Sequence, residues 1–284
     1  MRLAASAAAL SVGLATFGLS TAAAADDASP TASARAAGIN QPGDAHMGWS
    51  LVNDPKADQP AKGNAARSTA VASPSLVAAT TPGIDVSHWQ GSVNWTTYYN
   101  QGNRFAYIKS TEGTSYTDPN WGTNYTGSYN AGFIRGTYHF ARPDISTGAT
   151  QANFFVNNGG GWSADGKTLP GALDIEYNPY GATCYGLSQA SMRSWIDSFV
   201  NQYHARTTRW PVIYSTFDWW NTCTGNASNW STKSPFWIAR YNSTVGTLPA
   251  GYSYYTFWQW TSSPIDQDKF NGSMTGLTNL AKNT

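Results

Sequence analysis

The chain has 284 residues, a formal net charge of +1 and only 12% charged residues. This balance excludes electrostatic capture of nucleic acid as the main activity, because there is no basic excess to neutralise phosphates. The composition is also split. Residues 1–81 hold 24 alanines and two aromatic residues, whereas residues 82–284 hold the other 38 aromatics. One large folded unit is therefore predicted over 82–284, behind an N-terminal stretch with few core-forming residues.

The N-terminus predicts export. Arg2 precedes a mostly apolar run over 3–19, and three alanines over 23–25 supply the small residues of a cleavage site. This pattern is typical of a secretory signal peptide over 1–25. A membrane span is excluded, because the apolar run is too short and no stop-transfer pattern follows. We expect a secreted, extracellular protein that does not insert into a membrane.

Residues 26–81 mix Ala, Pro, Ser, Asp and Lys without hydrophobic periodicity. A segment of this composition cannot bury enough apolar surface of its own to offset its chain entropy. We therefore predict a disordered linker or a removable pro-segment, and the sequence leaves the choice between the two open.

Cys184 and Cys223 are the only cysteines in the chain. Two cysteines in an exported protein indicate a disulfide, and only one pairing exists. A two-cysteine metal site would need further ligands nearby, and no His or Cys lies at zinc spacing. We predict the disulfide and no metal.

The region 82–284 contains eight apolar runs of strand length. The predicted strands are 84–87, 105–110, 134–140, 172–176, 212–215, 236–239, 255–259 and 265–270. Helical periodicity lies between the early ones, most clearly over 147–158 and 188–203. Alternating strands and helices predict a parallel sheet, and eight strands predict a closed α/β barrel. The chain is short for eight complete strand–helix units, so the last three strands are expected to lack helices.

Acidic residues stand on or at the ends of the predicted strands, where barrel enzymes carry their catalytic groups. Asp85 lies on the first strand and Asp266 at the last. Asp174 and Glu176 end the fourth strand, and Glu176 is one of only two glutamates in the chain. These four residues are the candidate catalytic groups.

The pair Asp174 and Glu176 has the spacing of a catalytic carboxylate pair. Residues i and i+2 of a strand share a face, with Cα atoms about 6.6 Å apart. Burial and mutual repulsion should raise one pKa, giving a proton donor, while the other carboxylate stays ionised. Cleavage of a glycosidic bond needs such an acid and an anion, although this spacing does not decide between inversion and retention. A solvated or salt-bridged pair is the alternative.

Aromatic residues crowd the predicted strand ends. Aromatic faces stack on sugar rings, and the polar tips of Tyr and Trp bond hydroxyl groups. Many of these residues must form the core, but their number favours several in a groove. The candidate substrate-binding residues are Trp89, Tyr138, Tyr177, Trp219 and Trp260.

Several motifs, in order along the chain, resemble the glycoside hydrolase family 25 lysozymes, and within them the secreted Streptomyces N-acetylmuramidases. The resemblance covers about 82–275. The motifs are GIDVSHWQG (83–91), FAYIKSTEG (105–113), RGTYHF (135–140), LDIE (173–176), FWQW (257–260) and DQDKFNG (266–272).

The resemblance implies a modified TIM-like barrel of the (β/α)5(β)3 type that acts without a cofactor. It implies hydrolysis of the β-1,4 bond between N-acetylmuramic acid and N-acetylglucosamine in peptidoglycan by a monomer. Glu176 would be the general acid. Asp174 would support attack by the acetamido oxygen of the substrate, with retention of configuration. Asp85 and Asp266 would line the same pocket.

The resemblance also places Tyr138 in that pocket, near the acetamido group. Asp268 stands where relatives are expected to carry Asn, so it is open which of Asp266 and Asp268 faces the site. Two other classes of function remain: a peptidoglycan-binding module without activity, and an amide-cleaving wall hydrolase. The four acids argue against the first. The second usually needs zinc or a cysteine nucleophile.

Overall fold

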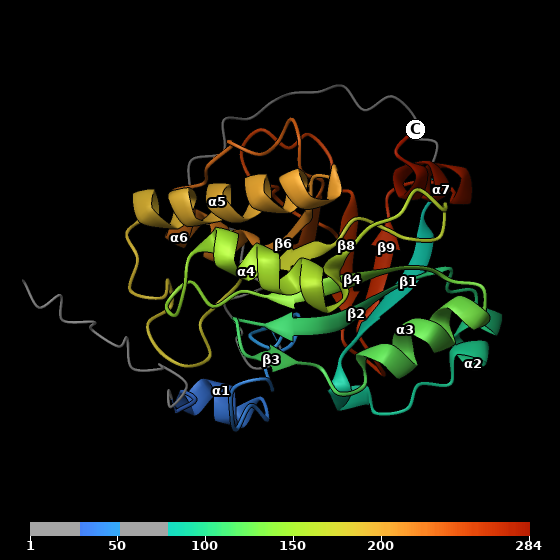
Figure 1. Ribbon diagram of the computed structural model, residues 1–284, viewed down its shortest axis with the longest axis horizontal. Helices are drawn as coiled ribbons and strands as arrows, with labels where there is room; N and C mark the ends of the chain where they lie inside the picture. Colours follow the sequence, from blue (N-terminus) through green and yellow to red (C-terminus); the bar gives the residue numbers. More distant parts are fainter. Residues whose placement is uncertain (1–28, 52–78) are drawn as a thin grey trace, which may run out of the picture.

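The computed structural model describes residues 29–51 and 79–284 (Figure 1). The predicted signal peptide and residues 52–78 of the predicted linker lie outside the described residues. Within the described ranges, no helix is long and apolar enough to cross a membrane.

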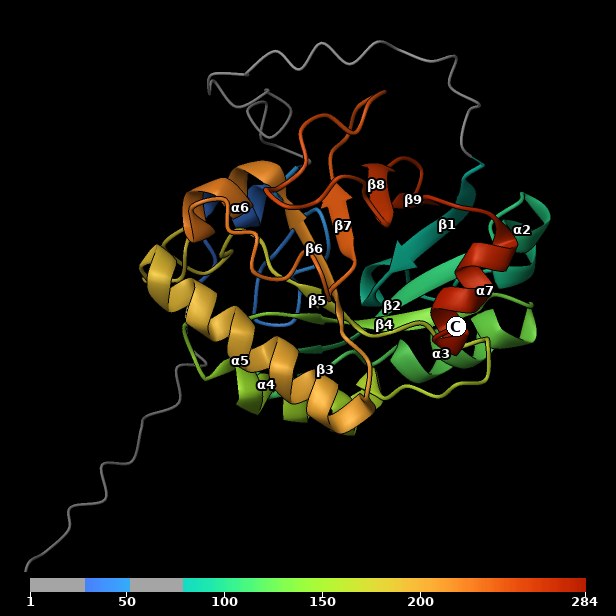
Figure 2. The ribbon, with the colours of Figure 1, turned by 90° about the horizontal axis from the view of Figure 1, so that it is seen from above.

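Eight strands close into a barrel, seen along its axis in Figure 2. Seven neighbouring strands are parallel, whereas the last strand is antiparallel to both β8 and β1 and closes the ring. A short ninth strand, β3 (Tyr116–Thr117), extends β2 outside the ring. The predicted eight-stranded barrel is therefore confirmed. The barrel strands are β1 (Thr81–Val86), β2 (Phe105–Glu112), β4 (Ile134–Phe140), β5 (Ala172–Asp174), β6 (Val212–Thr216), β7 (Phe236–Ala239), β8 (Phe257–Thr261) and β9 (Gln267–Phe270).

Helices cover the outside of the first strands. The prediction that the last three strands lack helices holds for β7 and β8, but it is wrong for β9, which α7 follows. Five short helices, including the one after β9, lie outside the two segments that were predicted to be helical. The helices are α1 (Ala32–Ala36), α2 (Trp95–Asn100), α3 (Trp121–Asn130), α4 (Gly148–Phe155), α5 (Gln189–Thr207), α6 (Phe217–Thr224) and α7 (Met274–Lys282), with a single 3-10 turn η1 (His88–Gln90) and a π-turn η2 (Val156–Gly160).

The longest helix, α5, begins where the sequence predicts. The Ser188 side chain caps it by accepting from the Ser191 amide, and its buried stripe includes Trp195 and Phe199. Helix α4 packs against it closely enough that a Cβ at Gly148 would overlap the backbone of both residues. Glycine is therefore required there, and the two helices lie side by side in Figure 2.

Aromatic side chains fill the barrel interior. The ring of Tyr107 lies 4.8 Å from that of Trp237 and 5.6 Å from that of Phe257, centroid to centroid. All three are fully buried. This packing closes the barrel below the carboxyl ends of the strands, so a substrate can reach the interior only from that end.

Residues 29–51 differ from the expectation of a disordered linker. They contain helix α1, and four of their apolar side chains are buried with Phe140 and Tyr180. Composition predicts only what a segment can bury against itself. Here the apolar partners belong to the barrel, which is why the expectation fails. The four side chains are Ala34, Ile39, Ala45 and Trp49.

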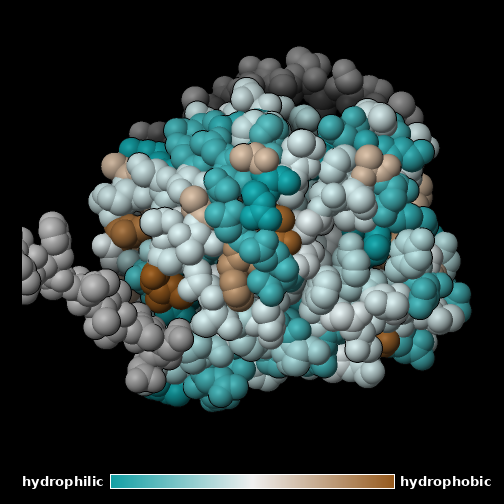
Figure 3. Space-filling model, in the orientation of Figure 1, coloured by the Kyte–Doolittle hydropathy of each residue, from teal (hydrophilic) through white to brown (hydrophobic). Residues whose placement is uncertain are grey.

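The face seen in Figure 3 is largely polar, with small separated apolar patches. This agrees with a surface built from Asn, Ser, Thr and Gly rather than from charged residues.

Candidate active site

The Asp174 and Glu176 carboxyls stand at the carboxyl end of β5. Asp174 is the last residue of that strand and Glu176 lies just beyond it. Both are fully buried. Within the described residues, no N–H or O–H group donates to either oxygen of Asp174, whose nearest acidic neighbour is Glu176. The hydroxyl of buried Tyr138, on β4, also has no partner there.

Asp85 faces the same pocket from β1. Its Oδ2 accepts a hydrogen bond of 2.7 Å from Nε2 of Gln259, on β8. Oε1 of Gln259 accepts in turn from the Tyr214 hydroxyl on β6, at 2.7 Å. This chain of hydrogen bonds crosses the barrel mouth and fixes the orientation of the Asp85 carboxyl.

Asp266 and Asp268 both point toward this cluster, as alternation along a strand allows. Asp268 accepts from the Trp237 indole at 3.1 Å and acts electrostatically on Asp85. Asp266 accepts from the Tyr241 hydroxyl at 3.3 Å and acts on both Asp85 and Glu176. Asp266 is therefore the one of the two whose charge acts on Glu176.

Burial governs the protonation of these acids. Desolvation raises the pKa of Glu176 to about 8, although the hydrogen bonds that it accepts oppose the shift. Desolvation, and then the charge of Glu176, raise the pKa of Asp174 well above its usual range. Sequence reasoning expected one of the two to stay ionised. Burial raises the pKa values of both carboxyls, and each of the two also acts on the other.

These shifts predict that the protein becomes less stable as the pH rises from 6.5 to 8. A carboxyl with a raised pKa keeps its proton in the folded state after the unfolded chain has lost it. Each such proton lowers the free energy of unfolding by about 1.4 kcal/mol per pH unit. His46 and His139, with pKa values lowered to about 4 and 3, are neutral in the folded state, whereas in the unfolded chain they still lose protons near pH 6.5 and so oppose the slope at the lower end of this window.

Thermal unfolding at several pH values measures this slope. The matched variant Glu176→Gln should show a shallower slope, because it removes one of the protons. Equal slopes would contradict the raised pKa of Glu176.

Residues 47–50 lie over the acids. The Gly48 amide donates to Glu176 Oε1 at 2.9 Å, and the Ser50 hydroxyl donates to Oε2 at 3.0 Å. The Met47 side chain is fully buried in the cluster that contains Tyr138 and Tyr214. Both oxygens of Glu176 are therefore occupied by the N-terminal segment.

Three of the five aromatic candidates lie around this pocket. Tyr138 is buried, and its electrostatic neighbours include Asp85 and Asp174. Tyr177 packs against the apolar cluster of residues 29–51 and donates to Asp218. Trp89 is 41% exposed, as a sugar-stacking platform would be.

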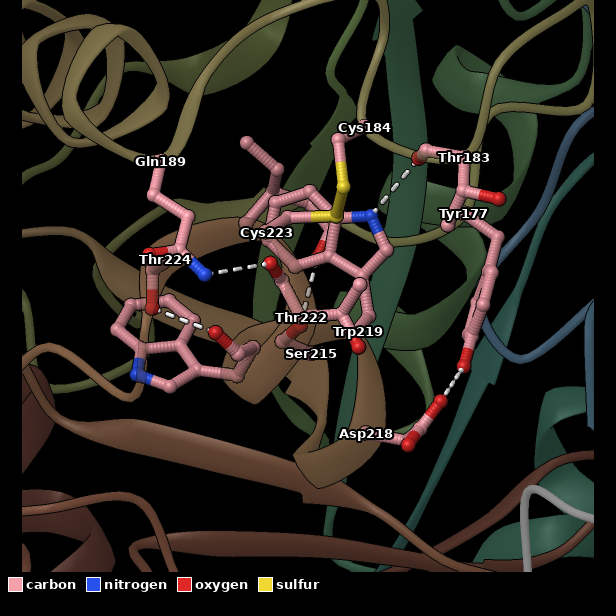
Figure 4. The surroundings of a disulfide bond; sticks show 12 residues. Tyr177, Thr183, Cys184, Gln189, Ser215, Asp218, Trp219, Thr222, Cys223 and Thr224 are labelled. Atoms are coloured by element: carbon pink, nitrogen blue, oxygen red, sulfur yellow. Dashed lines mark hydrogen bonds between the residues drawn. A yellow bond between two sulfur atoms is a disulfide. The ribbon is translucent and has the colours of Figure 1, made fainter.

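The other two candidates lie elsewhere. Trp219 is fully buried on α6 and donates to the Thr183 carbonyl at 3.1 Å. Its indole ring packs beside the Cys184–Cys223 disulfide (Figure 4). The prediction that Trp219 binds substrate is wrong, because the unpredicted helix turns this residue into the core.

Trp260, also predicted to bind substrate, does not lie with Gln259 at the acids. It lies beside Trp258 on β8, with the Lys269 ammonium 4.4 Å from its ring centroid. Successive residues of a strand point to opposite faces. Lys269 covers Trp258 and Trp260 together, although the pairing of β8 with β9 shifts register between Gln259 and Thr261, and substrate binding by Trp260 stays a prediction.

Trp219→Phe is expected to lower the free energy of unfolding by about 1–3 kcal/mol, because it leaves a void and an unpaired Thr183 carbonyl. Substrate affinity should not change. Denaturant unfolding and the KM on cell walls measure the two effects. A raised KM at unchanged stability would restore the substrate-binding role.

Sequence reasoning missed three polar residues of the site: Tyr214, Tyr241 and Gln259. Gln259 stands in the FWQW motif, and alternation along β8 could have placed it inside the barrel. Tyr241 follows β7 in a loop and carried no sequence signal.

Comparison with known proteins identifies the fold family. Residues 84–269 match the glycosyl hydrolases family 25. The chain belongs to this family.

Three relatives share half or nearly half of their aligned residues with this chain. It is 55% identical over 210 residues to Lysozyme M1 of Streptomyces globisporus, covering 71% of each chain. It is 46% identical over 209 residues to the N,O-diacetylmuramidase of Chalaropsis sp, covering 71% of this chain and 99% of that one. The bacterial lysozyme structure from Streptomyces coelicolor matches with a TM-score of 0.71 and 54% identity, covering 72% of this chain and 98% of that one.

Proposed function

We propose that this family 25 enzyme is a secreted N-acetylmuramidase. It hydrolyses the β-1,4 bond between N-acetylmuramic acid and N-acetylglucosamine in bacterial peptidoglycan. The observation that carries the proposal is the buried Asp174–Glu176 pair at the carboxyl end of β5, in a chain similar to a lysozyme and a diacetylmuramidase. The disulfide supports an extracellular location.

Glu176 acts as the general acid in this proposal. A catalytic acid must hold a proton at the working pH and give it to the glycosidic oxygen of the leaving sugar. Burial raises the pKa of Glu176 to about 8, so this carboxyl is mostly protonated at neutral pH. Burial raises the pKa values of Asp85 and Asp266 well above the usual range, and either carboxyl in its ionised form would favour a cationic sugar in the transition state.

Asp174 orients the acetamido group of the substrate. Both of its oxygens can accept a hydrogen bond, and the nearby Tyr138 hydroxyl can donate one. An N-acetyl group offers the matching N–H donor and carbonyl acceptor. Held in this way, the acetamido oxygen attacks the anomeric carbon as the leaving sugar takes the Glu176 proton, and water then opens the cyclic intermediate with retention of configuration.

The identity of the new reducing sugar tests the proposal. Purified peptidoglycan is digested with the protein, reduced with borohydride and hydrolysed, and the reduced amino sugars are identified. Muramitol is the expected product. Glucosaminitol would show cleavage of the other glycosidic bond and overturn the substrate assignment. If the cell wall binds the protein but gains no reducing ends, the result would favour a binding module without activity.

A further inference from the structure

Residues 29–51 lie in the site as a bound ligand would. A glycosidic oxygen must come within about 2.6–3.2 Å of the acid that protonates it. The Gly48 amide and the Ser50 hydroxyl take both positions on Glu176, and the carboxyl is fully buried beneath them. No saccharide can reach the acid while the segment is in place.

Gly48 sits deep among the polar residues of the pocket. A Cβ at this position would overlap the Tyr241 hydroxyl and come within 2.5 Å of Gln259 Oε1 and 3.2 Å of the Tyr214 hydroxyl. Its φ of +73° also lies in the left-handed region that favours glycine. The fit therefore requires that residue 48 have no side chain.

Two buried residues of β2 also hold the segment in place. The buried Lys109 ammonium pairs with Glu112 at 2.7 Å and donates to the carbonyls of Gly43, at 2.8 Å, and Ala45. Glu112 accepts from the Gly43 amide at 3.1 Å. The segment thus supplies partners to a buried ion pair, which would otherwise leave donors of Lys109 unpaired.

The exposed Trp89 side chain also contacts this segment. The Trp89 indole donates to the Asp44 carbonyl at 2.6 Å, and its ring meets His46 at 5.8 Å between centroids. At the other end of the segment, the Thr31 amide donates to the Pro179 carbonyl at 2.8 Å. The contacts therefore run from the aromatic rim to the acid, along the path that a polysaccharide would follow.

We propose that residues 29–51 are an intramolecular inhibitor that occupies the saccharide-binding cleft and blocks Glu176. The inference rests on the proposed muramidase function of that cleft.

The test uses the full chain with a change confined to the segment. Gly48→Leu should expel residues 47–50 without altering the barrel, and should raise the rate of peptidoglycan cleavage at least tenfold. Ala36→Leu adds a similar bulk at an exposed position of α1 and is the matched control. It should change the rate less than twofold. Equal rates for the wild type and Gly48→Leu would overturn the inhibition.

Reconstitution tests specificity. A synthetic peptide with the sequence of residues 29–51, added to the Gly48→Leu chain, should restore inhibition in a saturable manner. The same peptide carrying Gly48→Leu should not. Inhibition by both peptides, or by neither, would contradict recognition through Gly48.

Hydrogen exchange supplies a readout that does not depend on catalysis. The Gly43 and Gly48 amides should exchange slowly in the wild type and in Ala36→Leu, and rapidly in Gly48→Leu. If no variant cleaves peptidoglycan, the muramidase function fails, and slow exchange that Gly48→Leu abolishes would still support occupancy of the cleft. Rapid exchange in the wild type would overturn the proposal by itself.

Discussion

Glu176→Gln is expected to lower the rate of peptidoglycan cleavage by about 10²–10⁴-fold, the usual contribution of a general acid. Glutamine keeps the shape of the side chain but has no acidic proton to give to the leaving oxygen. Its amide oxygen can still accept from the Gly48 amide, which donates to Oε1 at 2.9 Å. The fold and the position of the segment should therefore be unchanged.

The measurement is best made in two backgrounds, the natural chain and the Gly48→Leu chain, because the segment covers the acid in the first. Glu176→Gln should still sediment with insoluble wall in the Gly48→Leu background. A rate within tenfold of that background would show that another group donates the proton. Asp174→Asn is the complementary control, since it leaves the acid in place and changes the acetamido contact.

Loss of the Cys184–Cys223 disulfide is expected to lower the free energy of unfolding by about 4 kcal/mol. The two cysteines are 39 residues apart, and the chain-entropy model gives about this value for a loop of that size. In a barrel of this size, such a loss corresponds to a fall in Tm of about 8–15 °C. Cys223 packs in the apolar cluster that contains Trp219 and Trp220, so catalysis at low temperature should persist.

Thermal scans with and without reductant make the comparison. Cys184→Ser should have the lower Tm without reductant, and reductant should bring the wild type down to the same value. The pH profile of activity should not move. A Tm of the variant equal to that of the oxidised wild type would show that the crosslink adds no stability.

Much of the barrel could be predicted from local pattern. The strands 134–140 and 236–239 coincide with the observed β4 and β7, and the second is a continuous apolar run, which suits a strand buried on both faces. The ends of β5 and β9 were placed less well. Asp174 and Ile265 adjoin polar residues of the site, where side-chain function and strand pairing impose different requirements.

The candidate catalytic acids could be named because carboxylates are rare in this chain and stand at strand ends. The aromatic residues were harder, since the sequence does not distinguish an indole that stacks on sugar from one that packs in the core. Trp219 illustrates this: its place is decided by α6, which was not among the predicted helices. Trp89 differs only in lying on an exposed turn.

The N-terminal segment was beyond sequence reasoning for another reason. Met47, Gly48 and Trp49 form no pattern of their own, and their partners stand more than a hundred residues away along the chain or on several different strands. Only the folded barrel brings together the pocket that they fill.

Residues 29–51 and the barrel belong to one chain, and this has a consequence for how dilution acts on the enzyme. While the chain is intact, association of the segment with the cleft is unimolecular, so the closed fraction does not depend on protein concentration. Once a peptide bond between residues 51 and 79 is cut, the same contacts hold two separate molecules. A segment with a dissociation constant of about 1 µM would then be half bound at that free concentration and about 1% bound a hundredfold below it. A single cut would thus convert a protein whose closed fraction does not change on dilution into one that opens as it is diluted.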